Sequence, residues 1–187
     1  MKELLTQSFL YSLFAILIFP LAGALINFIF TGIIKWILGI IDRRGVIFVF
    51  VANRLTFLGV IFHELSHAAF AFITGAKVTK ISLYHMQGGR LGYVKYKTRG
   101  PVFLRAIQMS LSSVAPVITG LIAEFYIFYF LYTMNFSKPV IALLIYLFIS
   151  VLFHMDMSHA DLINYFKGIP CCFIILFLSL TVILSCF

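Results

Sequence analysis

Charged residues are scarce in this sequence. Only 11% of its 187 residues are Asp, Glu, Lys or Arg, whereas about 25% is usual in a soluble domain. Apolar residues make up 63%, and several apolar runs reach the roughly 20 residues that cross a bilayer as a helix. These features exclude a soluble domain of appreciable size and predict one integral-membrane domain over residues 1–187, in contact with the lipid bilayer.

Cysteine and acidic residues are scarce as well. The three cysteines lie in the last apolar segment, without the paired spacing of a disulfide framework or a cysteine-rich zinc site. Six acidic residues stand against fourteen basic ones, which gives a net charge of +8. Because no soluble fold is available to display this charge, we interpret it as a signal of membrane topology and expect no nucleic-acid partner.

The apolar runs predict an α-helical polytopic membrane protein with about five to six transmembrane helices. A short interfacial piece is expected after the first span, at residues 32–38, and a short helix from Ser158 to Gly168 before the last one. The expected main spans are 8–30 with a kink at Pro20, 46–74, 105–134 with an interruption at Ala115-Pro116, 139–153 and 169–187.

Residues 76–100 differ from the rest of the chain. Their apolar residues recur with a period near two on either side of Gly88-Gly89, and such glycines supply the positive φ angles of a tight turn. This pattern predicts a small β-hairpin between the second and third spans, in preference to a solvated basic loop. Six basic residues gather here: Lys77, Lys80, Arg90, Lys95, Lys97 and Arg99.

The basic residues are distributed unequally between the two expected membrane faces. The face with the N-terminus, the hairpin and residues 154–168 holds nine, which are the six of the hairpin, Lys2, Arg105 and Lys167. The opposite face holds four, which are Lys35, Arg43, Arg44 and Lys138. Loops rich in Lys and Arg remain in the cytoplasm. We therefore expect the hairpin and the 154–168 segment on the cytoplasmic side of what we take to be a bacterial cell membrane.

The second span contains the sequence His63-Glu64-Leu65-Ser66-His67. In a helix, residues four apart lie on one face, so the two imidazoles can bind one metal ion. Glu64 lies about 100° round the helix from His63, near enough to accept a proton from a water on that ion. Ionisable side chains are costly inside an apolar segment unless they have partners, and a metal ion supplies them. The motif therefore predicts a metal site.

A catalytic zinc ion takes three protein ligands and keeps one position open, so a third ligand is needed. Asp161 follows Ser158 at a predicted helix start, a rigid place from which to project a carboxylate; the alternative is a first-turn acid that favours the helix dipole. Asp156 and Glu124 are alternatives, and Glu124 could instead pair with Arg54. The remaining candidates are the histidines at 85, 154 and 159.

With these residues the chain resembles the site-2 protease family, the intramembrane zinc metalloproteases. The resemblance rests on the His63–His67 motif, the Gly-rich hairpin, the segment Val114-Ala115-Pro116 with Gly120, and a late Asp. It covers residues 56–168, within the predicted core of the domain at 46–168. It implies zinc held by His63, His67 and Asp161, with Glu64 as the general base. One departure is that Leu162 follows Asp161, where the family usually has glycine.

The resemblance implies cleavage of a membrane-embedded or membrane-associated protein or peptide near the cytoplasmic face. The hairpin could hold such a substrate in an extended form or act as a lid, and a membrane-protein partner could contribute to substrate choice. Two other classes remain open. One is a non-proteolytic protein whose His and acidic residues conduct metal ions or protons, and the other is a catalytically silent assembly or immunity factor.

Overall fold

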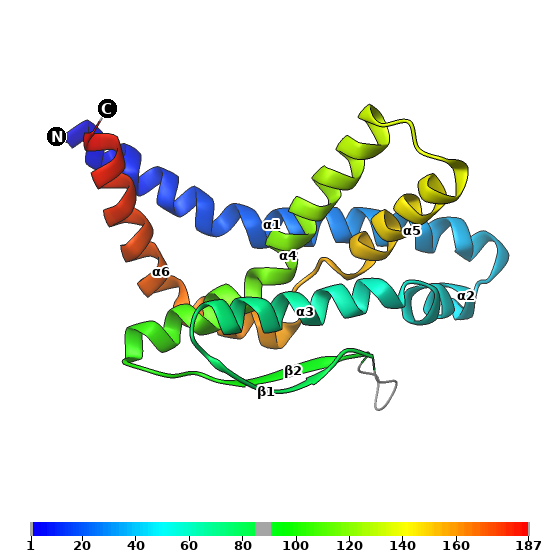
Figure 1. Ribbon diagram of the computed structural model, residues 1–187, viewed down its shortest axis with the longest axis horizontal. Coiled ribbons are helices and arrows are strands. Elements are labelled where there is room, and N and C mark those ends of the chain that lie inside the picture. Colours follow the sequence, from blue (N-terminus) through cyan, green and yellow to red (C-terminus); the bar gives the residue numbers. More distant parts are fainter. Residues whose placement is uncertain (1, 85–90, 187) are drawn as a thin grey trace.

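The computed structural model describes residues 2–84 and 91–186, which form helices and one small antiparallel sheet (Figure 1). Its elements are α1 (Lys2–Ile41), α2 (Val46–Phe50), the π-helix η1 (Val51–Leu55), α3 (Phe57–Ile73), β1 (Lys77–Ser82), β2 (Tyr93–Lys97), α4 (Val102–Thr133), α5 (Lys138–His154) and α6 (His159–Ser185). The expectation of a helical protein with one hairpin is confirmed. The predicted Gly88-Gly89 turn and His85 lie outside the described residues.

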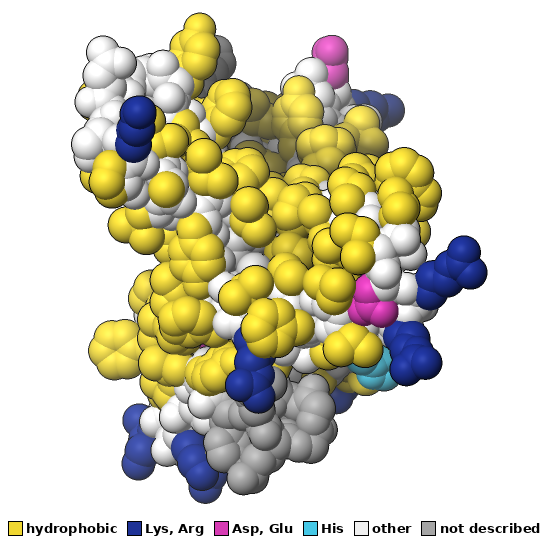
Figure 2. All heavy atoms as spheres, turned by 90° about the vertical axis from the view of Figure 1, so that its right-hand side faces the viewer, with side chains coloured by type: hydrophobic (Ala, Val, Ile, Leu, Met, Phe, Trp, Pro, Cys, Tyr) yellow, Lys and Arg dark blue, Asp and Glu magenta, His cyan; other side chains and the backbone are white. Residues whose placement is uncertain are grey.

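Among the described residues, three helices are long and apolar enough to cross a membrane, namely α1, α4 and α6. A fourth span results if α2, η1 and α3 are counted as one broken helix, bent by 54°. The apolar helix α5 has 17 residues, slightly fewer than the roughly 20 of a full span. Length and composition thus support three or four spans, fewer than the five to six expected. Figure 2 shows one face of the molecule, on which hydrophobic side chains predominate.

Three of the expected interruptions do not occur. Helix α1 continues through residues 32–38, where a separate interfacial piece was expected, and its 40 residues correspond to about 60 Å of helix, within which Pro20 lies. Helix α4 continues through Pro116, and α6 joins the expected short helix to the last span. The physical reason is that a proline removes one N–H donor, whereas leaving the helix in lipid would expose several polar backbone groups.

The helix that carries the His63 motif is broken at its start, where one continuous span was predicted. Thr56 leaves the helical conformation, and its hydroxyl donates to the carbonyl of Ala52 at 2.8 Å. The far end is as predicted. Gly75 has a φ of 86°, and the next N–H, of Ala76, donates to the carbonyl of Ala71 at 2.8 Å. Helix α3 is therefore a short helix with a defined start after the buried Thr56 and a defined end before Gly75.

Helix α4 packs against α3, α5 and α6, and α1 packs along α6. The contact between α3 and α5 is unusually close, since a Cβ atom on Gly59 would lie 1.9 Å from the carbonyl oxygen of Ser150. Small residues allow such approaches between membrane helices. A core of Ile16, Val114, Val117 and Tyr165 joins α1, α4 and α6. These contacts bring the start of α6 towards α3.

The two termini lie side by side in Figure 1, at the end of α6 remote from its first residue. The hairpin lies near the other end of α6. Lys2 is thus distant from the hairpin, although the sequence placed the two on one side of the membrane. Without Lys2, the sequence still assigns eight basic residues to the hairpin side. The charge asymmetry that motivated a cytoplasmic hairpin is reduced but persists.

Candidate metal centre

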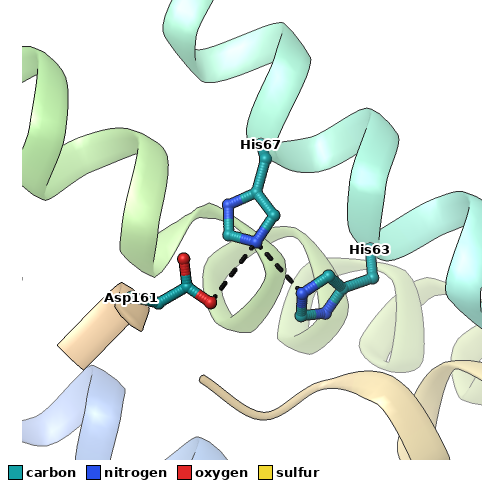
Figure 3. A group of neighbouring side chains, drawn as sticks. All are labelled: His63, His67 and Asp161. Carbon is teal, nitrogen blue, oxygen red and sulfur yellow. Dashed lines mark hydrogen bonds and ion pairs between the residues drawn. The ribbon is translucent and has the colours of Figure 1, made fainter. Parts of the chain in front are cut away.

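His63 and His67 lie on one face of α3, one turn apart, as their spacing predicts (Figure 3). Their ring centroids are 4.7 Å apart, and their two Nε2 atoms face each other at 3.0 Å. His67 is 8% exposed and His63 is half-buried.

Two backbone carbonyls determine which nitrogens face inward. Nδ1 of His63 lies 2.6 Å from the carbonyl oxygen of His154, and Nδ1 of His67 lies 2.7 Å from that of Ser112. A carbonyl oxygen only accepts, so each Nδ1 must carry the proton and donate. Each neutral ring then has a lone pair on Nε2, and the two lone pairs point at one another. Such an arrangement needs a cation or a shared proton between the two nitrogens.

Further contacts hold these carbonyls in place. The Ser112 hydroxyl donates to the carbonyl of His67 at 3.0 Å, so this fully buried serine contacts His67 twice. The ring of His154 hydrogen-bonds to Thr56 at the start of α3, at 3.0 Å. Partners that orient metal-binding histidines in this way tune their basicity and position. His154 was a candidate ligand in the sequence, but here its carbonyl orients His63 while its ring bonds elsewhere. No sequence pattern pointed to Ser112.

Asp161 reaches the same place from the first turn of α6. Its Oδ2 lies 3.7 Å from Nε2 of His67. The same oxygen accepts from the backbone N–H of Ser158 at 3.1 Å and from its hydroxyl at 2.5 Å. The backbone N–H of Asp161 in turn donates to the Ser158 hydroxyl at 3.2 Å, which completes a capping box. The predicted cap is confirmed. A role of Asp161 in this cap is compatible with its interpretation as a metal ligand.

One atom each from His63, His67 and Asp161 lies within 4.8 Å of the others. Ligands of a tetrahedral zinc ion, at about 2.0–2.1 Å from it, lie about 3.3 Å apart, between the separations of 3.0 and 3.7 Å found here. Two unprotonated imidazole nitrogens and a carboxylate are also the donor types that a catalytic zinc site uses. The residues present therefore fit a zinc ion.

Glu64 lines the cleft into which this cluster opens, a space of about 810 Å³. Its side chain is 8% exposed and is covered by the hairpin. A Cβ atom on Gly92 would lie only 2.7 Å from Cγ of Glu64 and 2.9 Å from its Oε1. Glycine at this position lets the backbone just before β2 close over the carboxylate. A proton-accepting group and a metal-binding cluster thus share one enclosed space.

The remaining candidates from the sequence lie outside the cluster. Asp156 and His159 are exposed and line the same cleft. Glu124 is 8% exposed in α4, and its carboxylate oxygens have no hydrogen-bond partner in the part of the chain that is described. The suggested ion pair between Glu124 and Arg54 does not form among the described residues. Metal binding by His63, His67 and Asp161 itself stays a prediction.

Comparison with known proteins adds one finding. A family model described as Peptidase M50B-like matches residues 35–187, which is most of the chain and includes every residue of the cluster. No curated protein and no solved structure matches the chain.

Proposed function

The chain belongs to the Peptidase M50B-like family, as its resemblance to the site-2 proteases indicated, and we propose on that premise that it is an intramembrane zinc metalloprotease. Its substrates would be membrane-embedded or membrane-associated proteins or peptides. The observation that carries the proposal is the pair of facing Nε2 atoms of His63 and His67, with Asp161 beside them, in the cleft that Glu64 lines.

In this proposal His63, His67 and Asp161 hold the ion. A bound zinc ion supplies acidity to a water molecule, lowering its pKa towards about 7, and polarises the carbonyl that is attacked. Glu64 accepts the proton of the attacking water and delivers it to the nitrogen of the departing amine, so that the peptide bond is exchanged for a carboxyl group and an amine. The Ser112 and His154 carbonyls keep both imidazoles in the tautomer that presents Nε2.

The hairpin gives the cleft a wall that can hold an extended peptide. Residues of β2 and the backbone before it line the cleft, including Gly92, Val94 and Tyr96. Only β1 pairs with β2 among the described residues, so the other edge of β2 has free backbone donors and acceptors. A substrate strand added to that edge would be unwound from its helix and held beside Glu64. The closeness of Gly92 to Glu64 supports this arrangement.

We further propose that the site faces the cytoplasm, in a bacterial cell membrane. The support is the eight basic residues that the sequence assigns to this side, six in the segment 76–100 together with Arg105 and Lys167. Cleavage is then expected near the cytoplasmic end of the substrate.

The test is to co-express a tagged single-span substrate with the wild type and with Glu64→Gln, and to locate the fragment ends by mass spectrometry. Glu64→Gln should retain zinc, because Glu64 is no ligand, while its cleavage rate falls by about 10²–10⁴-fold. Glu3→Gln, at an exposed position in α1, is the matched control and should cleave normally. Cleavage by Glu64→Gln at the wild-type rate would remove Glu64 from the mechanism, and fragments cut only at the outer end would reverse the topology.

A further inference from the structure

The outward face of the hairpin carries four lysines in two opposed pairs. Lys77 lies across from Lys97, and Lys80 lies across from Lys95. An irregularity of the register between Val78 and Lys80 leaves one extra residue there, which places both β1 lysines on the same face of the sheet. Like charges directly opposite each other on two strands destabilise the pairing. The sheet therefore bears a concentrated positive charge that disfavours its own formation.

Nothing in the described part of the chain neutralises these lysines. The sequence has no Asp or Glu between Glu64 and Glu124, and none of the four lysines forms an ion pair within the described residues. The ammonium groups of Lys80 and Lys95 lie over the ring of Tyr93, at 5.6 and 5.4 Å from its centroid. An aromatic ring attracts a cation but leaves its charge in place. An anionic partner from outside this chain would stabilise the face.

A groove of about 620 Å³ runs beside two of these lysines. Lys95 and Lys97 line it, and no acidic residue does. Val94, Tyr96 and Asn164 line both this groove and the cleft of the metal centre. The two spaces are therefore neighbours with a common wall, and a peptide that passes through the cleft along β2 continues into the groove.

We propose that this groove binds an acidic segment of the substrate, within a few residues of the bond to be cleaved. The proposal rests on the proposed proteolytic function and names a substrate class for it. Charge complementarity with Lys95 and Lys97 supplies the attraction, and the common wall supplies the connection to the reacting bond. Anionic lipid headgroups are the other class of anion at a membrane. The groove favours a peptide, because a bilayer surface needs exposed lysines but no groove leading to the metal centre.

The test measures binding apart from cleavage. Glu64→Gln protein in nanodiscs of neutral phosphatidylcholine is titrated with two fluorescent single-span peptides, identical except for four Glu or four Gln residues beside the span. The acidic peptide should bind about tenfold more tightly at low salt, and added salt should reduce the difference. Adding Lys95→Gln and Lys97→Gln should bring the two peptides to within about twofold. The matched control, Lys2→Gln with Lys138→Gln, removes as much charge from exposed positions far from the groove and should change nothing.

Three results would overturn the proposal. Equal affinity of the starting protein for both peptides removes the preference itself. An equal loss in the control variant assigns the preference to net charge. The experiment is repeated in nanodiscs that contain phosphatidylglycerol. If Lys95→Gln with Lys97→Gln changes peptide affinity only there, and not in phosphatidylcholine, the two lysines bind lipid headgroups and not the peptide. Cleavage by the wild type is measured separately. If neither peptide is cut while the acidic one still binds more tightly, the proteolytic function fails and the anion site stands.

Discussion

Asp161 has two structural roles in this fold, and substitutions at two neighbouring positions separate them. As the partner of Ser158 it caps α6, and as a neighbour of His67 it is the proposed third metal ligand. Ser158→Ala removes the cap and leaves the carboxylate. Asp161→Ala removes both. If Asp161 were only a capping residue, the two variants would behave alike.

The expected magnitudes differ clearly. Loss of an N-cap side chain costs about 1 kcal/mol of stability. Ser158→Ala also removes a hydrogen bond at 2.5 Å that orients Oδ2, and losing such an outer partner typically weakens metal binding about 10–100-fold. Asp161→Ala removes a ligand itself and should weaken binding beyond that range. Asp156→Ala and Glu124→Ala should leave zinc affinity unchanged, because neither residue belongs to the cluster.

Zinc affinity is measured on detergent-purified protein by competition with a chromophoric chelator, and stability by thermal unfolding of the metal-free protein. Metal-free Ser158→Ala and Asp161→Ala should show similar losses of stability, since both lack the cap, and differ in zinc affinity. Equal zinc affinities for Asp161→Ala and the wild type would refute the ligand assignment and leave Asp161 as a cap alone. Loss of zinc in Asp156→Ala would move the ligand to the preceding turn.

Three other predictions concern the walls and ligands of the cleft. His63→Ala and His67→Ala should each lose zinc, measured by elemental analysis, and keep the helical circular dichroism of the wild type. Gly92→Val should retain zinc but lose most peptidase activity, because its Cβ would lie 2.7 Å from Cγ of Glu64; unchanged activity would mean that the hairpin can move away freely. Burial raises the pKa of Tyr96, so its neutral form favours the fold at neutral pH, and this stabilisation is lost as the pH rises through that raised value. Tyr96→Phe should accordingly unfold with a weaker dependence on pH above about 10, and an unchanged dependence would contradict this.

Local patterns in the sequence predicted much of the site. The spacing of His63 and His67 placed both rings on one helix face, and Ser158 followed by Asp161 predicted the cap that the structure contains. The period-two pattern predicted both strands of the hairpin. Each of these features depends on residues within a few positions of one another, where helix and strand geometry alone determines which side chains share a face.

The features that the sequence did not predict depend on distant contacts. The orientation of His63 comes from the carbonyl of His154, and any residue type can supply a carbonyl at a helix end. The bend before α3 arises where Thr56 bonds to the preceding turn and to His154. The interruption expected at Ala115-Pro116 does not form, because in lipid a helix is retained around a single missing donor.

The two backbone hydrogen bonds to the histidines have a consequence for the order in which the protein becomes active. The carbonyls belong to α4 and α5, and the proposed third ligand begins α6, so the centre draws on four helices that leave the ribosome one after another. A nascent chain that has inserted only α3 holds the two histidines without the carbonyls that orient them. On the proposed ligand set, its affinity for zinc stays low until residue 161 has joined them. On the proposed function, hydrolysis would then begin only once the cleft around Glu64 is closed, and the growing chain and its neighbours in the membrane would be spared premature cleavage.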